Sequence, residues 1–142
     1  MKAATDVGPL SDADYRSLAR FRHALRAFTR FSEEAARAAG LTPAQHQLLL
    51  AVRGHPDGMP APLADVAEML QLRVHSVGEL VDRAVGNGLV SRLADPDDHR
   101  RALVVLTPHG EHVLDGLARL HRDELRRFRR EMNEVLRELD QA

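Results

Sequence analysis

A β-hairpin stands out in a chain whose other patterned segments have helical spacing. Two short apolar runs, 89–93 and 101–106, are separated by the polar turn segment Ala94-Asp95-Pro96-Asp97-Asp98-His99. Short apolar runs on either side of such a segment are typical of paired antiparallel strands. Elsewhere the apolar residues recur at steps of three and four, so the sequence predicts a mainly α fold (α+β) with one small hairpin.

Three start signals mark helices on both sides of this hairpin. Ser11–Asp14 forms a capping box before the first helix, and Thr42–Gln45 forms a second box with proline at the first helical position. The second helix ends at Gly54, and three prolines make residues 55–62 a predicted loop. Thr107-Pro108 repeats the start signal before a last helix. Whether this helix is continuous or broken near residues 129–132 stays open at this point.

Two short helices are predicted directly before the hairpin. Residues 62–70 and 74–87 each carry apolar side chains on one face, and Gln71 and Leu72 form the turn between them. Two short helices joined by a tight turn and followed by a hairpin are typical of a winged helix-turn-helix. We therefore predict this motif over residues 41–107.

The terminal segments, 1–40 and 108–142, carry apolar stripes too long to be covered within so small a domain. Such stripes are buried when two copies of a chain pair through the same surface. We expect an N-terminal dimerisation helix and one or two C-terminal dimerisation helices, and therefore a homodimer.

Composition excludes several classes of site. The chain has no cysteine, so it has no disulfides, cysteine metal ligands or thiol chemistry. The N-terminal segment lacks the apolar core of a secretory signal and no apolar run could span a bilayer, so we expect a cytoplasmic protein without membrane contact. The net charge of −1 does not favour nucleic acid, but local placement of arginines decides binding.

From about Leu18 to Leu139 the chain resembles the multiple-antibiotic-resistance regulator (MarR) family. The order and spacing of four stretches carry the resemblance: Leu41-Thr42-Pro43-Ala44-Gln45; Asp65-Val66-Ala67-Glu68-Met69-Leu70; Leu80-Val81-Asp82-Arg83 through Gly88-Leu89-Val90; and the wing Asp95-Pro96-Asp97-Asp98-His99-Arg100-Arg101 with Leu106-Thr107-Pro108-His109-Gly110. The resemblance implies an obligate dimer on a pseudo-palindromic operator in double-stranded DNA. It also implies a transcriptional regulator, commonly a repressor released by a small aromatic or anionic effector.

The start of the second short helix supplies the candidate base-reading residues, because that end of a recognition helix faces base edges in the major groove. An arginine pairs bidentately with guanine, a serine or histidine donates to bases or phosphates, and a carboxylate accepts from cytosine N4 but is repelled by phosphate. Ser76 has the alternative role of a first-turn cap. The candidates are Arg73, His75, Ser76 and Glu79.

Two wing residues, Asp98 and Arg100, match the family motif. Asp98 and Arg100 are expected to form an ion pair that braces the hairpin while an arginine enters the narrow minor groove. Arg101 is the second candidate for that insertion. The alternative is a solvated turn whose surface charges contribute little.

By the same resemblance, an effector pocket is expected between the dimer helices and the winged domain, with Phe28, Phe31, His46 and Leu50 on its wall. An apolar pocket with few polar groups suits a small aromatic acid. The alternative is that Phe28 and Leu50 belong to the core.

Other functions have weaker support in the residues. The chain has eight histidines, and His109 and His112 lie three apart on a helix, which leaves a zinc-responsive regulator of the same fold as an alternative. A metal site needs three or four convergent ligands, so we expect no metal and no cofactor. The sequence contains no nucleophile motif and no phosphate-binding loop, so we do not expect an enzyme. A third possibility is a dimeric interaction protein that has lost DNA binding, suggested by Glu79 and the neutral charge balance.

Overall fold

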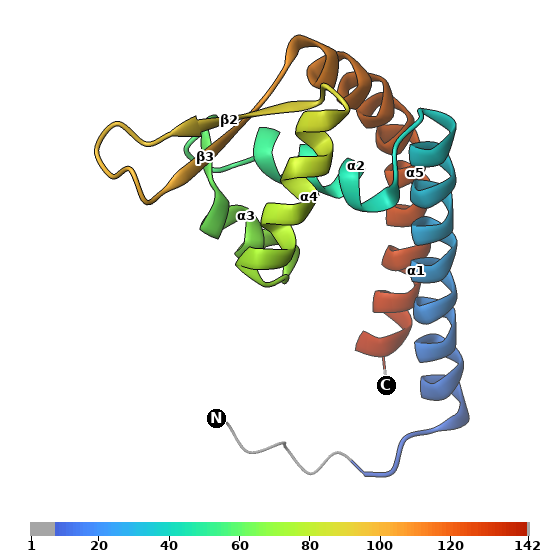
Figure 1. Ribbon diagram of the computed structural model, residues 1–142. Coiled ribbons are helices and arrows are strands. Elements are labelled where there is room, and N and C mark those ends of the chain that lie inside the picture. The colour runs from blue at the N-terminus through green and yellow to red at the C-terminus, as the bar shows by residue number, and fades with distance from the viewer. Residues whose placement is uncertain (1–7, 142) are drawn as a thin grey trace. The chain divides into compact units, whose positions relative to one another are not determined.

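The computed structural model describes residues 8–141 and shows a mainly helical chain with one small antiparallel sheet (Figure 1). The predicted fold class is confirmed. The elements in chain order are α1 (Asp12–Ala38), α2 (Pro43–Arg53), β1 (Ala61–Pro62), α3 (Leu63–Leu70), α4 (Val74–Gly86), β2 (Val90–Ala94), β3 (Ala102–Leu106) and α5 (Pro108–Asp140).

The chain forms two compact units. The first, here called the terminal-helix unit, comprises the described parts of Met1–Ser32 and His121–Ala142, and the second, the winged-helix unit, comprises Glu33–Leu120. The winged-helix unit therefore takes in the end of α1 and the start of α5 in addition to the predicted 41–107. The assignment of 1–40 and 108–142 to dimerisation remains a prediction.

Predicted helix starts match the observed caps. In α2 the Thr42 side chain accepts from the backbone of Gln45, while the Gln45 side chain accepts from the backbone of Thr42, at 3.1 Å in both directions. Ser11 and Asp14 exchange the equivalent pair of hydrogen bonds, at 2.9 and 3.2 Å. Each box satisfies two backbone N–H groups that a helix start otherwise leaves unbonded.

The structure differs from the sequence prediction at two elements. Ala61–Pro62 forms a short strand, β1, where a loop was predicted, and it pairs with β3 so that the sheet order is β1-β3-β2. The last helix is unbroken from Pro108 to Asp140, so the considered break near residues 129–132 is absent. Nothing in that stretch removes a backbone donor, because it contains neither proline nor glycine.

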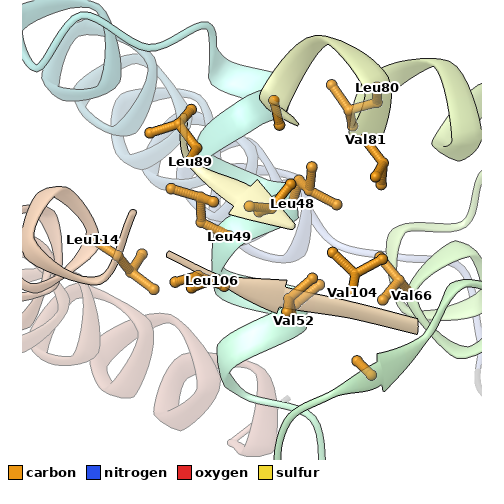
Figure 2. Packing of buried hydrophobic residues seen from close by; sticks show 14 of the residues in the cluster. Leu48, Leu49, Val52, Val66, Leu80, Val81, Leu89, Val104, Leu106 and Leu114 are labelled. Carbon is orange, nitrogen blue, oxygen red and sulfur yellow. The ribbon is translucent and has the colours of Figure 1, made fainter. Parts of the chain in front are cut away.

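The core of the winged-helix unit lies where α2, α3 and α4 meet the sheet (Figure 2). Apolar side chains from every one of these elements converge there and hold α4 against the sheet. The labelled members are Leu48, Leu49, Val52, Val66, Leu80, Val81, Leu89, Val104, Leu106 and Leu114.

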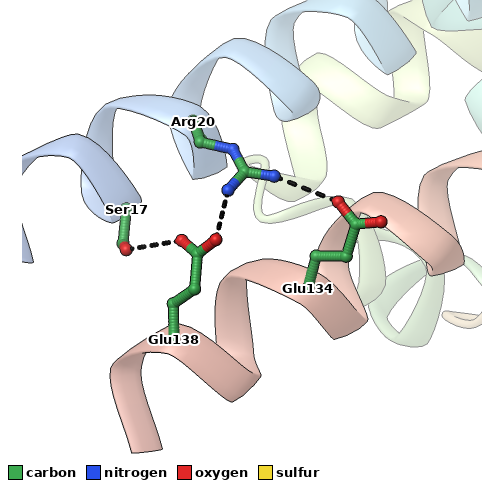
Figure 3. A network of polar contacts seen from close by, with 4 residues as sticks. All are labelled: Ser17, Arg20, Glu134 and Glu138. Atoms are coloured by element: carbon green, nitrogen blue, oxygen red, sulfur yellow. Dashed lines mark hydrogen bonds and ion pairs between the residues drawn. The ribbon is translucent and has the colours of Figure 1, made fainter. Parts of the chain in front are cut away.

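In the terminal-helix unit, α1 and α5 are joined by polar and aromatic contacts. The Ser17 hydroxyl donates to Glu138 at 2.9 Å, and Arg20 donates to both Glu138 and Glu134 (Figure 3). The hydrogen bond from Ser17 and the Arg20 guanidinium lower the pKa of Glu138, and the hydrogen bond to Glu138 raises the pKa of Arg20. Further along, the rings of Phe28 and Phe128 lie 5.2 Å apart between centroids.

Several large apolar side chains of this unit remain exposed to solvent in the single chain. Tyr15 is 60% exposed and Leu125 48% exposed, while Ser17, which lies on the opposite side of α1 from Tyr15, is 4% exposed. In residues 8–141 no helix is both long and apolar enough to cross a membrane.

Candidate nucleic-acid interface

The recognition helix α4 presents a polar face opposite the core. Its buried residues are Val77, Leu80, Val81 and Ala84. The residues that lie one turn apart on the opposite side, His75, Glu79 and Asp82, are exposed. The core contacts therefore hold the helix so that this polar stripe faces outward.

The predicted base-reading residues lie together at the start of α4. Arg73 is the N-cap residue in extended conformation, and it makes no side-chain cap hydrogen bond. Ser76 lies in the first turn, but its hydroxyl forms no hydrogen bond with any residue of the described chain, so the capping alternative has no support. His75 Nε2 lies 3.4 Å from Glu79 Oε1. The structure thus exposes all four predicted residues, with Arg73, His75 and Ser76 at the start of α4 and Glu79 in its next turn.

A further arginine, which the sequence did not indicate, joins the wing to α4. Arg92 on β2 donates from a guanidinium nitrogen to the Gly78 carbonyl at 3.0 Å, and its Nε lies 3.1 Å from Asp82 Oδ1. One side chain thereby bonds two successive turns of the recognition helix. The contact joins residues 14 positions apart, and no local pattern marks it.

The wing turn is held by backbone hydrogen bonds to two aspartates. Asp98 Oδ1 accepts from the Arg100 backbone N–H at 3.0 Å, which is a different interaction from the expected ion pair between the two side chains. Asp95, which is 8% exposed, accepts from the Asp97 backbone N–H at 2.9 Å and lies 3.8 Å from Arg101. The ion pair of the wing is therefore formed by Asp95 and Arg101.

These contacts leave Arg100 uncommitted. Within residues 8–141 its guanidinium forms no ion pair and no hydrogen bond, whereas that of Arg101 faces Asp95. Of the two arginines predicted for minor-groove insertion, Arg100 has the side chain that is available.

The formal charges of the winged-helix reading surface are balanced, and ion pairs decide which of them remain available. Residues 73–107 contain five arginines and five acids. Four of the acids are engaged: Glu79 by His75, Asp82 by Arg92, Asp95 by Arg101, and Asp98 by the Arg100 backbone. Across the described chain, Arg73, Arg83 and Arg100 form no ion pair. Only the ion pairs of Asp82 and Asp95 with arginines neutralise charge, so three arginines without an ion pair remain beside three acids that no arginine pairs, Glu79, Asp97 and Asp98.

The four predicted effector residues divide between the two units. In the terminal-helix unit, the Phe31 ring lies 5.5 Å from the His121 ring between centroids, and Phe28 packs against the same histidine at 6.2 Å. In the winged-helix unit, His46 is buried and Leu50 is 49% exposed. That they line one pocket stays a prediction.

Leu50 lines a hollow of about 620 Å³ within the winged-helix unit. Its polar wall includes Arg53 and Glu111, whose side chains lie 3.7 Å apart, and His112. The sequence did not single out Arg53. In the described part of the chain no three histidines, aspartates or glutamates gather as ligands for a metal ion.

Comparisons with known proteins agree with this geometry. Residues 39–101 match the model of the MarR family. No curated protein matches the chain by sequence comparison.

Solved structures match over most of the chain. AbsC, a MarR family transcriptional regulator from Streptomyces coelicolor, has 24% identity and a TM-score of 0.75, with 96% of this chain and 93% of that chain covered. A mutant of MarR from E. coli, complexed with operator DNA, has 23% identity and a TM-score of 0.69, with 87% and 91% covered. Bordetella bronchiseptica BpsR, in a structure on the regulation of its DNA binding by 6-hydroxynicotinic acid, has 22% identity and a TM-score of 0.63, with 84% and 94% covered. Residues 39–101 therefore match the MarR family model, and the chain has the winged helix-turn-helix fold seen in solved structures of MarR family regulators.

Proposed function

We propose that the protein is a homodimeric, sequence-specific DNA-binding transcriptional regulator, and that it acts as a repressor whose DNA binding a small aromatic or anionic ligand relieves. One observation carries the DNA-binding proposal. At the exposed end of α4 and on the wing, Arg73 and Arg100 carry guanidinium groups that form no ion pair with any acid in residues 8–141. Such groups are available to phosphates and base edges.

The docking that this arrangement supports uses both grooves of the duplex. The start of α4 enters the major groove, where Arg73 pairs bidentately with guanine and His75, Ser76 and Glu79 meet neighbouring base edges or phosphates. The wing reaches the adjacent minor groove, where Arg100 meets the negative potential of a narrow segment.

A second copy of the chain would double this contact. The exposed apolar side chains of the terminal-helix unit, such as Leu18, Leu125 and Leu136, support pairing through α1 and α5. A two-fold dimer reads a pseudo-palindromic operator, with half-sites separated by about 10 base pairs or a multiple of that.

Effector control is supported by the hollow beside Leu50 and by the BpsR comparison. The hollow combines apolar side chains with Arg53 and His112, but Glu111 and Asp115 also line it, so an aromatic carboxylate would bind Arg53 there by displacing its partner Glu111. A ligand seated there changes DNA affinity only if it binds the DNA-competent and the DNA-incompetent conformations differently.

The deciding experiment is selection of bound duplexes from a random DNA pool at a stated salt concentration, followed by titration of the enriched duplex and a scrambled one. We expect enrichment of an inverted repeat and an affinity that falls steeply with salt. Enrichment of no sequence, together with salt-independent retention, would contradict DNA binding and favour a dimeric interaction protein.

A screen of aromatic carboxylic acids against the enriched complex tests the effector. If none alters DNA affinity or melting temperature, the effector proposal fails.

A further inference from the structure

Two acids lie on the outer face of α4, and only one is held by the fold. Asp82 is fixed by Arg92, which approaches within 3.1 Å from the neighbouring strand. Glu79 has a side chain that is 58% exposed, and its one ion-pair contact is with His75, whose side chain is 88% exposed. A carboxylate on a surface that approaches DNA is repelled by the phosphates, so a role for Glu79 has to offset that repulsion.

His75 and Glu79 form a side-by-side donor and acceptor. They lie four residues apart, so their side chains are neighbours on the helix surface, and their polar atoms are 3.4 Å from each other. Both lie opposite the buried residues Val77 and Val81. An imidazole carries at least one N–H in either protonation state, whereas an ionised carboxylate only accepts hydrogen bonds.

A C·G base pair offers the complementary set in the major groove. Cytosine N4 is a donor at one side of the pair, and guanine O6 and N7 are acceptors beside it. An A·T pair has its N6 donor between two acceptors and adds the thymine methyl group. Only the C·G pair has its donor at one end of the row of polar groups, with both acceptors on the same side of it.

We propose that His75 and Glu79 together read one C·G pair in each half-site, with Glu79 accepting from cytosine N4 and His75 donating to guanine O6 or N7. This inference rests on the proposed DNA-binding function and names its specificity. The hydrogen bond from cytosine offsets the repulsion of Glu79 by phosphates, and His75 reduces that repulsion further when it is protonated. Arg92 acts as a positioning residue, because it bonds the helix turns that carry this pair to the wing.

The test repeats the random-pool selection with wild type, Glu79→Gln and His75→Ala. Glu131→Gln is the matched control, since it makes the same chemical change at an exposed position of α5, outside α4. We expect wild type and the control to select C·G at one position per half-site. Glu79→Gln should shift that position toward A·T, because an amide pairs with adenine N6 and N7. His75→Ala should reduce the preference for C·G by about tenfold, within the range of one good base contact.

A modified duplex separates this contact from a minor-groove one. Inosine opposite cytosine keeps O6, N7 and N4 in the major groove and lacks the minor-groove amino group of guanine. Replacing the proposed C·G pair with this pair should leave wild-type affinity within about twofold, since each retained hydrogen bond is unchanged.

The outcomes distinguish this inference from the function on which it rests. If no duplex is enriched by wild type, the proposed DNA binding fails and this reading fails with it. If a duplex is enriched but Glu79→Gln selects the same bases as wild type, or only binds all sequences more tightly, the paired reading is overturned while DNA binding stands. A change with His75→Ala alone also overturns it, because Glu79 would then read no base.

Discussion

Arg73 and Arg100 have the same side chain in two different settings. Arg73 occupies the N-cap position of α4, where side chains face the major groove in this motif, and Arg100 follows a wing turn closed by the Asp98 carboxylate. The same substitution at the two positions should therefore produce two different losses.

Arg100→Ala should weaken binding to most sequences alike, because a minor-groove contact reads width and charge and not base identity. The slope of log affinity against log salt should become shallower by about one unit for each arginine removed. Titration across a salt series checks this. Arg130→Ala is the control, because it removes one positive charge at an exposed position of α5. An unchanged affinity and slope would contradict the assigned role of the wing.

Arg73→Ala should instead relax the preference at one position per half-site, since a bidentate contact contributes about 1–3 kcal/mol of discrimination. Competition between cognate and single-base variant duplexes measures this. If every duplex weakens by the same factor, Arg73 binds the phosphate backbone, and specificity belongs to the remaining residues of α4.

Gly110 is fixed by a close backbone approach at the start of α5. A Cβ added there would clash with the Leu89 carbonyl oxygen. Gly110→Ala should lower the free energy of unfolding by about 1–3 kcal/mol or more, because α5 must move away from Leu89. Gly86→Ala, where a Cβ meets nothing within 4 Å, should raise it by up to about 1 kcal/mol. Denaturant titration compares both with wild type, and equal effects would show that the approach at Leu89 is not tight.

Between elements, the contact of α1 with α5 should depend on pH through Glu138. Its pKa is lowered from the ordinary 4.5 by the Ser17 hydrogen bond and by Arg20, so the stabilisation is present above the unfolded-state pKa and is lost as pH falls through the lower folded value. Glu138→Gln should therefore lower the melting temperature at neutral pH, and the difference from wild type should shrink below about pH 4.5. A difference that stays constant down to pH 3 would show that the network adds nothing through ionisation.

Local signals predicted the helices better than the contacts between elements. The Thr42 box and the Thr107-Pro108 start are encoded within four residues, and both appear where expected. Strand β1 has two residues, too few for an alternation pattern, and exists through its pairing with Val104 and Leu103. The bond from Arg92 to Gly78 and the burial of Asp95 arise only once the hairpin has folded onto α4, so no sequence pattern carried them.

For the whole molecule, the central prediction is a stable homodimer. Light scattering at micromolar concentration should give twice 15.8 kDa, and a particle of 15.8 kDa would contradict it. Leu125→Glu should shift the equilibrium toward monomer, because it places a charge among apolar side chains of the terminal-helix unit. Leu93→Glu is the matched control, since Leu93 on the wing is 45% exposed and Leu125 is 48% exposed.

Strand β1 also bears on how copies of the molecule avoid unwanted association. It is an outer strand of the sheet, and an outer strand with free backbone groups is a template for aggregation. Here that strand has two residues, and one is Pro62, which has no N–H to offer an incoming chain. Pro62 also stands at the N-cap of α3, where it forms no side-chain hydrogen bond and forgoes a cap typically worth about 1 kcal/mol. The same residue thus lowers the stability of α3 slightly and, because it offers no N–H, hinders the addition of a further strand to this edge of the sheet.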